Sequence, residues 1–168
     1  IALRLAASLS APTRDVTYVF YDCEEIEAAF NGLKRIAEKH PDWIAGDFAV
    51  LMEPSNAGVE GGCQGTMRIE VRTSGRRAHT ARGWMGVNAI HGAGDIIDRL
   101  RKYETRKVMI DGLEYREGLQ AVFISGGVAG NVVPDECVVT VNHRYAPSRS
   151  AAEAEAHLRE VFDGFEVT

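Results

Sequence analysis

The hydrophobic pattern of the chain changes at a cluster of four glycines, Gly58, Gly61, Gly62 and Gly65. Before the cluster, two short runs at 16–20 and 48–52 are continuously apolar, which is typical of strands buried on both faces of a parallel sheet. After it, residues 66–74 alternate apolar and polar side chains, which predicts an antiparallel strand with one exposed face. We therefore expect two domains, with residues 1–60 as part of an α/β domain and residues 61–168 as a second, smaller domain.

Composition excludes several classes of function. With 45% apolar and 26% charged residues, the 168-residue chain has the composition of a soluble globular protein. A net charge of −5 without a basic cluster argues against nucleic acid as a partner. The sequence contains no run of about 18 apolar residues, so we expect no membrane span. Three scattered cysteines indicate a reducing compartment, so we expect a cytoplasmic protein. The chain begins without methionine and ends in an expected strand, so we also expect an internal piece of a longer protein.

Carboxylates follow both continuously apolar runs. We expect the first domain to be a parallel βαβ unit after an initial helix, with elements at 1–10, 15–20, 28–40 and 48–52. Glu24 and Glu25 follow the first strand, and Glu53 follows the second. Because the carboxyl ends of parallel strands meet at one edge of a sheet, these acids are candidates for a metal site, where a cation offsets their repulsion. The alternative is that Glu24 and Glu25 only charge the start of a helix, and that Glu53 is a polar loop residue.

The second domain is expected to have a ferredoxin-like arrangement, in the order β-α-β-β-α-β. Alternation and helical periodicity predict its elements at 66–74, 88–103, 119–125, 137–145, 150–162 and 165–168. Ser150 and Glu153 have the spacing of a capping box at the start of the last helix.

Three polar residues of the second domain are candidates for substrate contacts. His79 lies between arginines in a loop after a strand, and its imidazole could donate a hydrogen bond. Asn131 lies in a turn and could offer its amide to a substrate, while Arg144 could hold a carboxylate with both guanidinium nitrogens. The alternatives are a surface histidine in a basic loop, an asparagine that tolerates a left-handed turn, and an arginine on a solvated strand face.

Several motifs occur together in a specific order: Tyr21-Asp22-Cys23-Glu24-Glu25-Ile26-Glu27, Leu51-Met52-Glu53-Pro54-Ser55, Gly75-Arg76-Arg77-Ala78-His79-Thr80-Ala81-Arg82, Gly86-Val87-Asn88-Ala89-Ile90, Gly126-Gly127 and Asn131-Val132-Val133-Pro134-Asp135. Over essentially the whole chain, this order resembles the zinc-dependent amidohydrolases and exopeptidases that include succinyl-diaminopimelate desuccinylase, acetylornithine deacetylase, aminoacylase and the glutamate carboxypeptidases. The details are most similar to the desuccinylases of bacteria, in particular of actinobacteria. The resemblance implies a partial parallel-sheet catalytic domain and an inserted dimerisation, or lid, domain.

For the first domain, the resemblance implies a zinc-dependent reaction. Glu24 would be the general base that activates a metal-bound water and passes its proton to the leaving amine. Glu25 would ligate one zinc ion and Glu53 the other, with two zinc ions per subunit and cobalt as an alternative metal. The resemblance also requires an upstream histidine, a bridging aspartate and a later histidine, which this chain lacks. We therefore expect weak or absent zinc binding and no turnover by these residues alone.

For the second domain, the resemblance implies a homodimer formed through its outer helix and strand edge. His79 would come from the lid domain of the partner subunit and stabilise the tetrahedral oxyanion. Asn131 and Arg144 would hold polar groups of a small acyl-amino-acid substrate. For the intact protein we expect removal of succinate from N-succinyl-LL-2,6-diaminopimelate in lysine and diaminopimelate biosynthesis. The alternatives are acetylornithine deacetylase or another acyl-amino-acid hydrolase or carboxypeptidase, and a dimerisation module without chemistry of its own.

Overall fold

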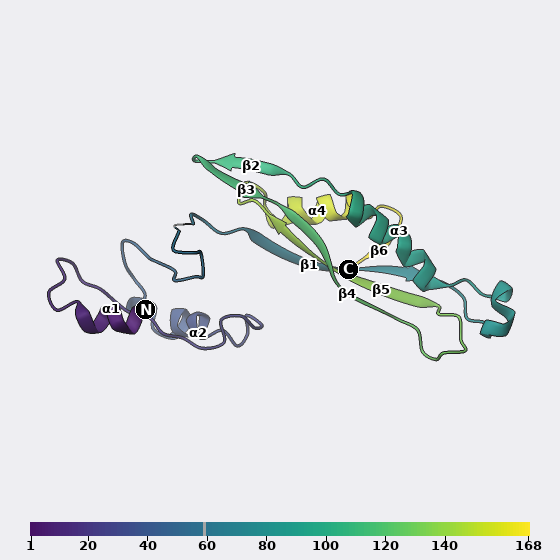
Figure 1. Ribbon diagram of the computed structural model, residues 1–168, viewed down its shortest axis with the longest axis horizontal. Helices are drawn as coiled ribbons and strands as arrows, with labels where there is room; N and C mark the ends of the chain where they lie inside the picture. Colours follow the sequence, from purple (N-terminus) through teal and green to yellow (C-terminus); the bar gives the residue numbers. More distant parts are fainter. Residues whose placement is uncertain (59) are drawn as a thin grey trace. The chain divides into compact units, whose positions relative to one another are not determined.

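The computed structural model describes residues 1–58 and 60–168 of the chain. The chain separates into two units, Ile1–Ala57 and Gly58–Thr168 (Figure 1). All of the described strands and the two longest helices belong to the second unit.

The first unit contains short helices joined by irregular segments: α1 (Ala2–Ser8), α2 (Gly32–Lys39) and the 3-10 helix η1 (Pro41–Trp43). The helix predicted at 28–40 begins later, because the side chain of Asn31 caps α2 by accepting a hydrogen bond from the Lys34 N–H at 3.0 Å. None of the helices in the part of the chain that the structure describes is long and apolar enough to cross a membrane.

The prediction of strands at 15–20 and 48–52 is wrong for this structure, and with it the predicted parallel sheet. A buried parallel strand requires neighbouring strands and helices on both faces. The two runs do not form strands, and their apolar side chains are largely exposed, including Phe20 at 58% and Phe48 at 87%. The sequence pattern describes side chains suited to burial, but the described residues of this unit do not provide a sheet that could bury them.

The second unit is built on an antiparallel sheet with the strand order β4-β5-β1-β6. Its elements are β1 (Gly65–Ser74), η2 (Thr80–Met85), α3 (Ala89–Lys102), β2 (Lys107–Ile110), β3 (Leu113–Arg116), β4 (Gly118–Gly126), β5 (Glu136–Tyr145), α4 (Ala151–Val161) and β6 (Glu166–Val167). Strand β5 lies between β1 and β4, and the β4–β5 register shifts between Ala121 and Phe123. The four strands and two helices of the predicted β-α-β-β-α-β order are present, and Ser150 and Glu153 form the predicted capping box.

The hairpin β2–β3 has no counterpart in the sequence prediction. Its strands pair from Lys107 with Arg116 to Ile110 with Leu113. Asp111 and Gly112 connect the strands, and both have positive φ angles, of 50° and 81°. An Asp-Gly pair between two short strands is a recognised hairpin signal, so the sequence did contain the information.

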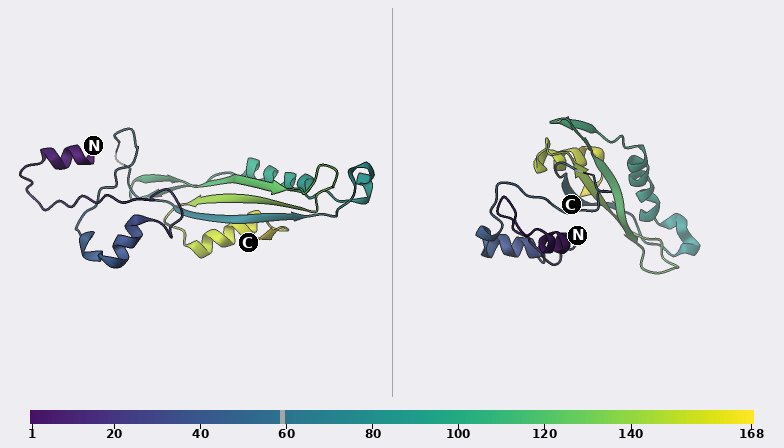
Figure 2. Two further views of the ribbon diagram at one scale, coloured as in Figure 1. Left: turned by 90° about the horizontal axis from the view of Figure 1, so that it is seen from below. Right: turned by 60° about the vertical axis from the view of Figure 1, so that its left-hand side comes forward.

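One face of the four-stranded sheet carries the core. Buried positions alternate along β1 and β5, as in Val71 with its register partner Val139. Residues of both helices, such as Ile96 and Leu158, belong to the same buried cluster, so both helices cover this face. In the left view of Figure 2, α3 lies along the β4 side of the sheet and α4 along the β1 side. The opposite face of the sheet is polar and half-exposed along β5.

A buried carboxylate, Glu117, joins the base of the hairpin to the segment between β5 and α4. Its side chain is fully buried and accepts hydrogen bonds from Arg106 Nη2 at 2.8 Å and from the Ala146 N–H at 3.1 Å. Arg149 Nη2 lies 3.7 Å from the other carboxylate oxygen and is itself mostly buried. Glu117 therefore connects the two ends of the β2–β3 hairpin to the segment that carries Ala146 and Arg149.

Two histidines lie beside this carboxylate, with their ring centroids 5.8 Å apart. His143 is fully buried, and its Nδ1 lies 3.0 Å from the carbonyl oxygen of Gly118. His157 Nε2 lies 2.8 Å from the hydroxyl of Tyr103. Glu117 and His157 make this end of the domain sensitive to protonation.

We expect the free energy of unfolding to fall as the pH is lowered. Burial alone would raise the pKa of Glu117, but hydrogen bonds from Arg106 and Ala146 and the charge of Arg149 outweigh burial and lower it. Burial, followed by the charge of Arg149 and the neighbouring His143, lowers the pKa of His157. In both cases the unfolded chain binds protons more readily, so stability is lost below about pH 6.5 through His157 and further below about pH 4.3 through Glu117.

Urea unfolding of the chain between about pH 3 and pH 8, a range that includes the titration of carboxylates, measures this dependence. His157→Gln should flatten the part of the curve between pH 5 and 7 and leave the more acidic part in place. A free energy of unfolding that stays level or rises on acidification would contradict the assignment.

Candidate functional site

Two loops meet at one end of the sheet, between β1 and α3 and between β4 and β5. The Thr80 N–H donates to the Asn131 carbonyl at 2.9 Å, and the Val133 N–H donates to the Ala78 carbonyl at 2.8 Å. His79 and Val132 form an antiparallel bridge between these contacts. The two loops therefore hold His79 and Asn131 close together, although 52 positions separate them in the sequence (131 − 79 = 52).

Two arginines fix the shape of these loops. Arg76 Nε donates to the Met85 carbonyl at 2.9 Å and closes the loop around η2. Arg77 Nε lies 2.8 Å from Asp135 Oδ1, and this hydrogen bond is the main reason why the pKa of Asp135 is lowered. Gly75 fits where Val87 and Pro134 approach, because a Cβ atom at this position would overlap the Val87 carbonyl oxygen.

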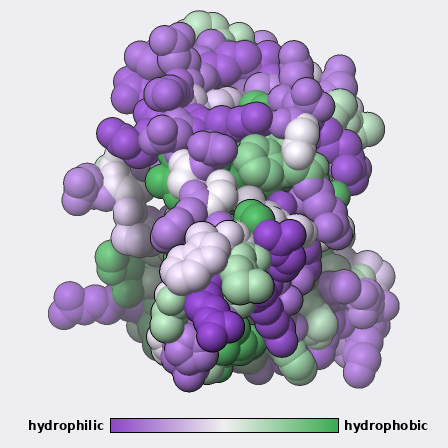
Figure 3. Space-filling model, turned by 90° about the vertical axis from the view of Figure 1, so that its right-hand side faces the viewer, coloured by the Kyte–Doolittle hydropathy of each residue, from purple (hydrophilic) through white to green (hydrophobic). Residues whose placement is uncertain are grey.

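Figure 3 faces the end of the second unit that carries these loops. The surface there is mostly hydrophilic but includes hydrophobic patches. Exposed apolar side chains of the loops and the adjoining helix include Trp84, Met85, Val87, Ile90 and Val128. The end of the sheet that carries the two loops thus combines polar groups that can bind a ligand with apolar surface that a ligand or another protein surface can bury.

The backbone fixes which ring nitrogen of His79 can donate a hydrogen bond. The Ala81 N–H donates to His79 Nδ1 at 3.1 Å, so Nδ1 is an acceptor and the neutral ring carries its proton on Nε2. His79 is exposed, which leaves Nε2–H available for an external acceptor. This arrangement suits the stabilisation of a developing negative charge on oxygen.

We expect His79 and His143 to be opposite tautomers. His143 Nδ1 faces a carbonyl oxygen, which can only accept, so the proton of this ring must lie on Nδ1. Long-range ¹H–¹⁵N correlation spectra of the histidine-labelled chain at pH 7.5 distinguish the two forms. The exposed His91 on α3 provides the reference, because its ring has no hydrogen-bond partner among residues 1–58 and 60–168. A proton on Nδ1 of His79 would exclude the proposed donor geometry.

The structure separates the three predicted substrate contacts. Asn131 is exposed beside His79, and within the described residues its side-chain amide has no hydrogen-bond partner. Arg144 lies near the far end of β5, paired in register with Thr66 and Gly118. The eight residue-to-residue steps from Glu136 to Arg144 span about 27 Å in an antiparallel strand. One copy of the domain therefore brings Asn131 to His79 but not Arg144.

The predicted metal ligands do not form a metal site within this structure. Glu24, Glu25 and Glu53 are exposed. Across residues 1–58 and 60–168, no group of three or more histidine, cysteine, aspartate or glutamate side chains is arranged to hold a metal ion. Two or three carboxylates without histidine are also a poor donor set for zinc. The residues present do not fit a complete zinc centre, and the assignments of Glu25 and Glu53 as ligands remain predictions.

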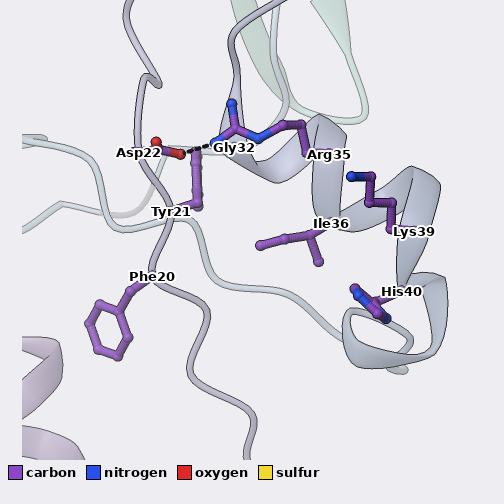
Figure 4. Close-up of a pocket in the computed structure, with 8 residues that line it drawn as sticks. All are labelled: Phe20, Tyr21, Asp22, Gly32, Arg35, Ile36, Lys39 and His40. Atoms are coloured by element: carbon purple, nitrogen blue, oxygen red, sulfur yellow. Dashed lines mark hydrogen bonds and ion pairs between the residues drawn. The ribbon is translucent and has the colours of Figure 1, made fainter.

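The first unit has a cavity of about 520 Å³ that is not lined by the predicted metal ligands. It is bounded by the segment Phe20–Asp22 and by α2, as Figure 4 shows. Arg35 Nη2 contacts Asp22 Oδ1 at 2.6 Å, and Lys39 and His40 lie along the same side. The residues that line the cavity do not include the three predicted acids. It is an open hollow beside a short helix and offers no support for the predicted chemistry.

A family model described as a peptidase dimerisation domain, M20_dimer, matches residues 62–165. The chain belongs to this family. The match covers β1 through α4, and therefore both loops that hold His79 and Asn131. The dimerisation domain is thus the part of the chain in which the sequence prediction and the folded structure agree.

Curated relatives extend the similarity beyond the dimerisation domain. A Corynebacterium glutamicum protein named succinyl-diaminopimelate desuccinylase is 44% identical over 97% of this chain and 45% of its own length. A Mycobacterium tuberculosis protein, provisionally given the same name, is 55% identical over 99% of this chain and 47% of its own length. A carboxypeptidase-like protein of Ajellomyces capsulatus is 31% identical over 58% of this chain and 23% of its length. The chain spans about half the length of the first two relatives.

Proposed function

We propose that the chain is part of a metal-dependent amide hydrolase that converts N-succinyl-LL-2,6-diaminopimelate to succinate and diaminopimelate. The main support is the identity of 44% to a named desuccinylase over nearly the whole chain, which includes both the loop end and the acidic segment. The reaction belongs to the intact protein, since these residues correspond to about half of such a relative. We expect the metal to be zinc, with Glu25 and Glu53 among its ligands.

The proposal assigns two proton-handling groups. Glu24 is the general base that takes a proton from the attacking water and delivers it to the leaving amine. His79 of the partner subunit donates Nε2–H to the oxyanion that forms when water adds to the amide carbonyl. Asn131 and Arg144 contact polar groups of the substrate. The support for His79 is its fixed tautomer and its exposed Nε2.

Succinate release by the purified intact protein tests the function. We expect turnover of N-succinyl-LL-diaminopimelate at least about 100-fold faster than turnover of N-acetylornithine or a dipeptide, because a site built to bind a charged group discriminates strongly against substrates that lack it. A preference for either of the other substrates would replace the desuccinylase proposal with a deacetylase or peptidase.

A second candidate function is dimerisation alone, without chemistry of its own. The support for this candidate is that the matched family is described as a dimerisation domain. The candidate interface is the outer edge of β4 with the adjoining α3. Strand β4 pairs only with β5 in the described sheet, and Val122, Phe123 and Ile124 are exposed along it. An unpaired strand edge with apolar side chains can extend a sheet into a second copy. We therefore propose a homodimer that forms through this edge.

Phe123→Lys should raise the dimer dissociation constant at least roughly tenfold, because it places a charge at an apolar strand edge. Met109→Lys is the matched control, since Met109 is similarly exposed but lies on the β2–β3 hairpin. Sedimentation velocity measures both variants. A wild-type chain that is monomeric would exclude the module and leave the enzyme proposal for the intact protein in place.

A further inference from the structure

The loop that carries His79 contains three arginines, Arg76, Arg77 and Arg82. The structure uses the first two to hold the loops together, through the Met85 carbonyl and Asp135 respectively. The guanidinium group of Arg82 has no hydrogen-bond or ion-pair partner among the residues that the structure describes. Of the three, Arg82 is therefore the cation available to a ligand.

The position of Arg82 is tied directly to that of His79. The Arg82 N–H donates to the carbonyl oxygen of His79 at 2.8 Å, and the Ala81 N–H holds the imidazole. Thr80, between them, is hydrogen-bonded to Asn131 across the loops. The backbone of Arg82 is thus fixed relative to the imidazole and to Asn131, while its side chain is exposed.

The local charge favours an anionic ligand. Asp135, the acidic side chain that contacts this loop, is already paired with Arg77. Arg82 therefore adds a positive charge that no described carboxylate neutralises. A guanidinium group on a fixed backbone loses little freedom when it binds a carboxylate with two parallel hydrogen bonds.

We propose that Arg82 binds a substrate carboxylate next to the scissile amide and is a specificity-determining residue. This inference rests on the proposed desuccinylase function, in which His79 contacts the carbonyl oxygen of that amide. The proposed substrate has two such carboxylates, one at the end of the succinyl group and one on the α-carbon of the acylated amino acid. Because the Arg82 N–H is hydrogen-bonded to the His79 carbonyl, we expect the Arg82 side chain to lie beside the amide that His79 contacts.

Three substrates distinguish the two carboxylates: N-succinyl-LL-diaminopimelate, its analogue with the succinyl carboxylate replaced by a carboxamide, and its analogue with the α-carboxylate replaced by a carboxamide. For the intact enzyme with Arg82→Ala, we expect kcat/KM on the parent substrate to fall by roughly 10- to 100-fold. The same substitution should have little effect on the analogue that lacks the carboxylate bound by Arg82. Arg82→Lys should recover part of the loss, since it keeps the charge but not the planar pair of donors.

Arg116→Ala is the matched control, because the Arg116 side chain is exposed on the β2–β3 hairpin and, in the part of the chain that the structure describes, its guanidinium pairs with the nearby Glu114. We expect it to leave kcat/KM unchanged on all three substrates. An Arg82→Ala penalty that is equal on all three substrates, or absent on the parent, would overturn the assignment. A wild-type enzyme that does not hydrolyse the parent substrate would instead overturn the proposed function, so the two failures give different results.

Discussion

Glu117→Gln should destabilise the second unit by about 3–5 kcal/mol, the largest stability effect that we expect from a single substitution in this chain. The substitution leaves Arg149, which is mostly buried, without the carboxylate that neutralises it. It also weakens the links from Arg106 and Ala146 to the same oxygen. Because a buried charge without a partner cannot recover its hydration, the cost exceeds that of the lost hydrogen bonds alone.

Glu114→Gln provides the control for Glu117→Gln. Glu114 also pairs with an arginine, Arg116, but both side chains are exposed to solvent. Its loss should cost far less than the loss of Glu117, because water screens a solvent-exposed ion pair. Urea unfolding at pH 7 measures both variants, and equal effects would show that Glu117 is not the buried connection described above.

Glu24→Gln should reduce kcat of the intact enzyme by about 10²- to 10⁴-fold, the range expected when a general base is lost. Glutamine has nearly the same shape but cannot take a proton from water. If Glu25 and Glu53 rather than Glu24 bind the metal, the zinc content of the variant should match that of the wild type. Single-turnover kinetics and elemental analysis measure the two quantities.

Glu27→Gln is the control for this experiment, because Glu27 lies in the same acidic segment and has no assigned role. It should retain wild-type kcat and zinc. Loss of zinc from Glu24→Gln would mean that the roles of Glu24 and Glu25 are exchanged. Full activity in Glu24→Gln would exclude Glu24 as the base.

The second unit could be predicted because its sequence pattern and its burial pattern agree. Met67, Ile69 and Val71 alternate with charged residues, and the sheet that buries this face is formed by strands within the same unit. Asn88 and Ser150 begin helices where their side chains can accept backbone hydrogen bonds. Local sequence and tertiary contacts therefore lead to the same structure.

In the first unit, the sequence pattern did not predict the secondary structure correctly. A continuously apolar run such as 48–52 indicates a preference for burial, but a strand forms only when neighbouring strands complete it. The candidate site was likewise predicted only in part. The sequence motif identified His79 as a candidate site residue. The contacts of Arg76 and Arg77 in the structure were needed to identify Arg82 as the arginine of this loop that is available to a ligand.

The buried cluster around Glu117 could not have been found from sequence, because Arg106 and Glu117 flank an unpredicted hairpin and Arg149 lies in a separate segment without a shared motif. Their proximity follows from the way in which the hairpin and α4 meet the end of β5. A buried ion-pair cluster of this kind can be identified only from the folded structure.

The hydrogen bonds between the two loops have a kinetic consequence for any ligand. Because residues 78–80 and 131–133 are joined through their backbones, the backbones of His79 and Asn131 cannot move independently. Arg82 is attached to the same backbone through the His79 carbonyl. Any displacement of these loops therefore moves the three residues together, so we expect a single loop rearrangement in the kinetics of ligand binding.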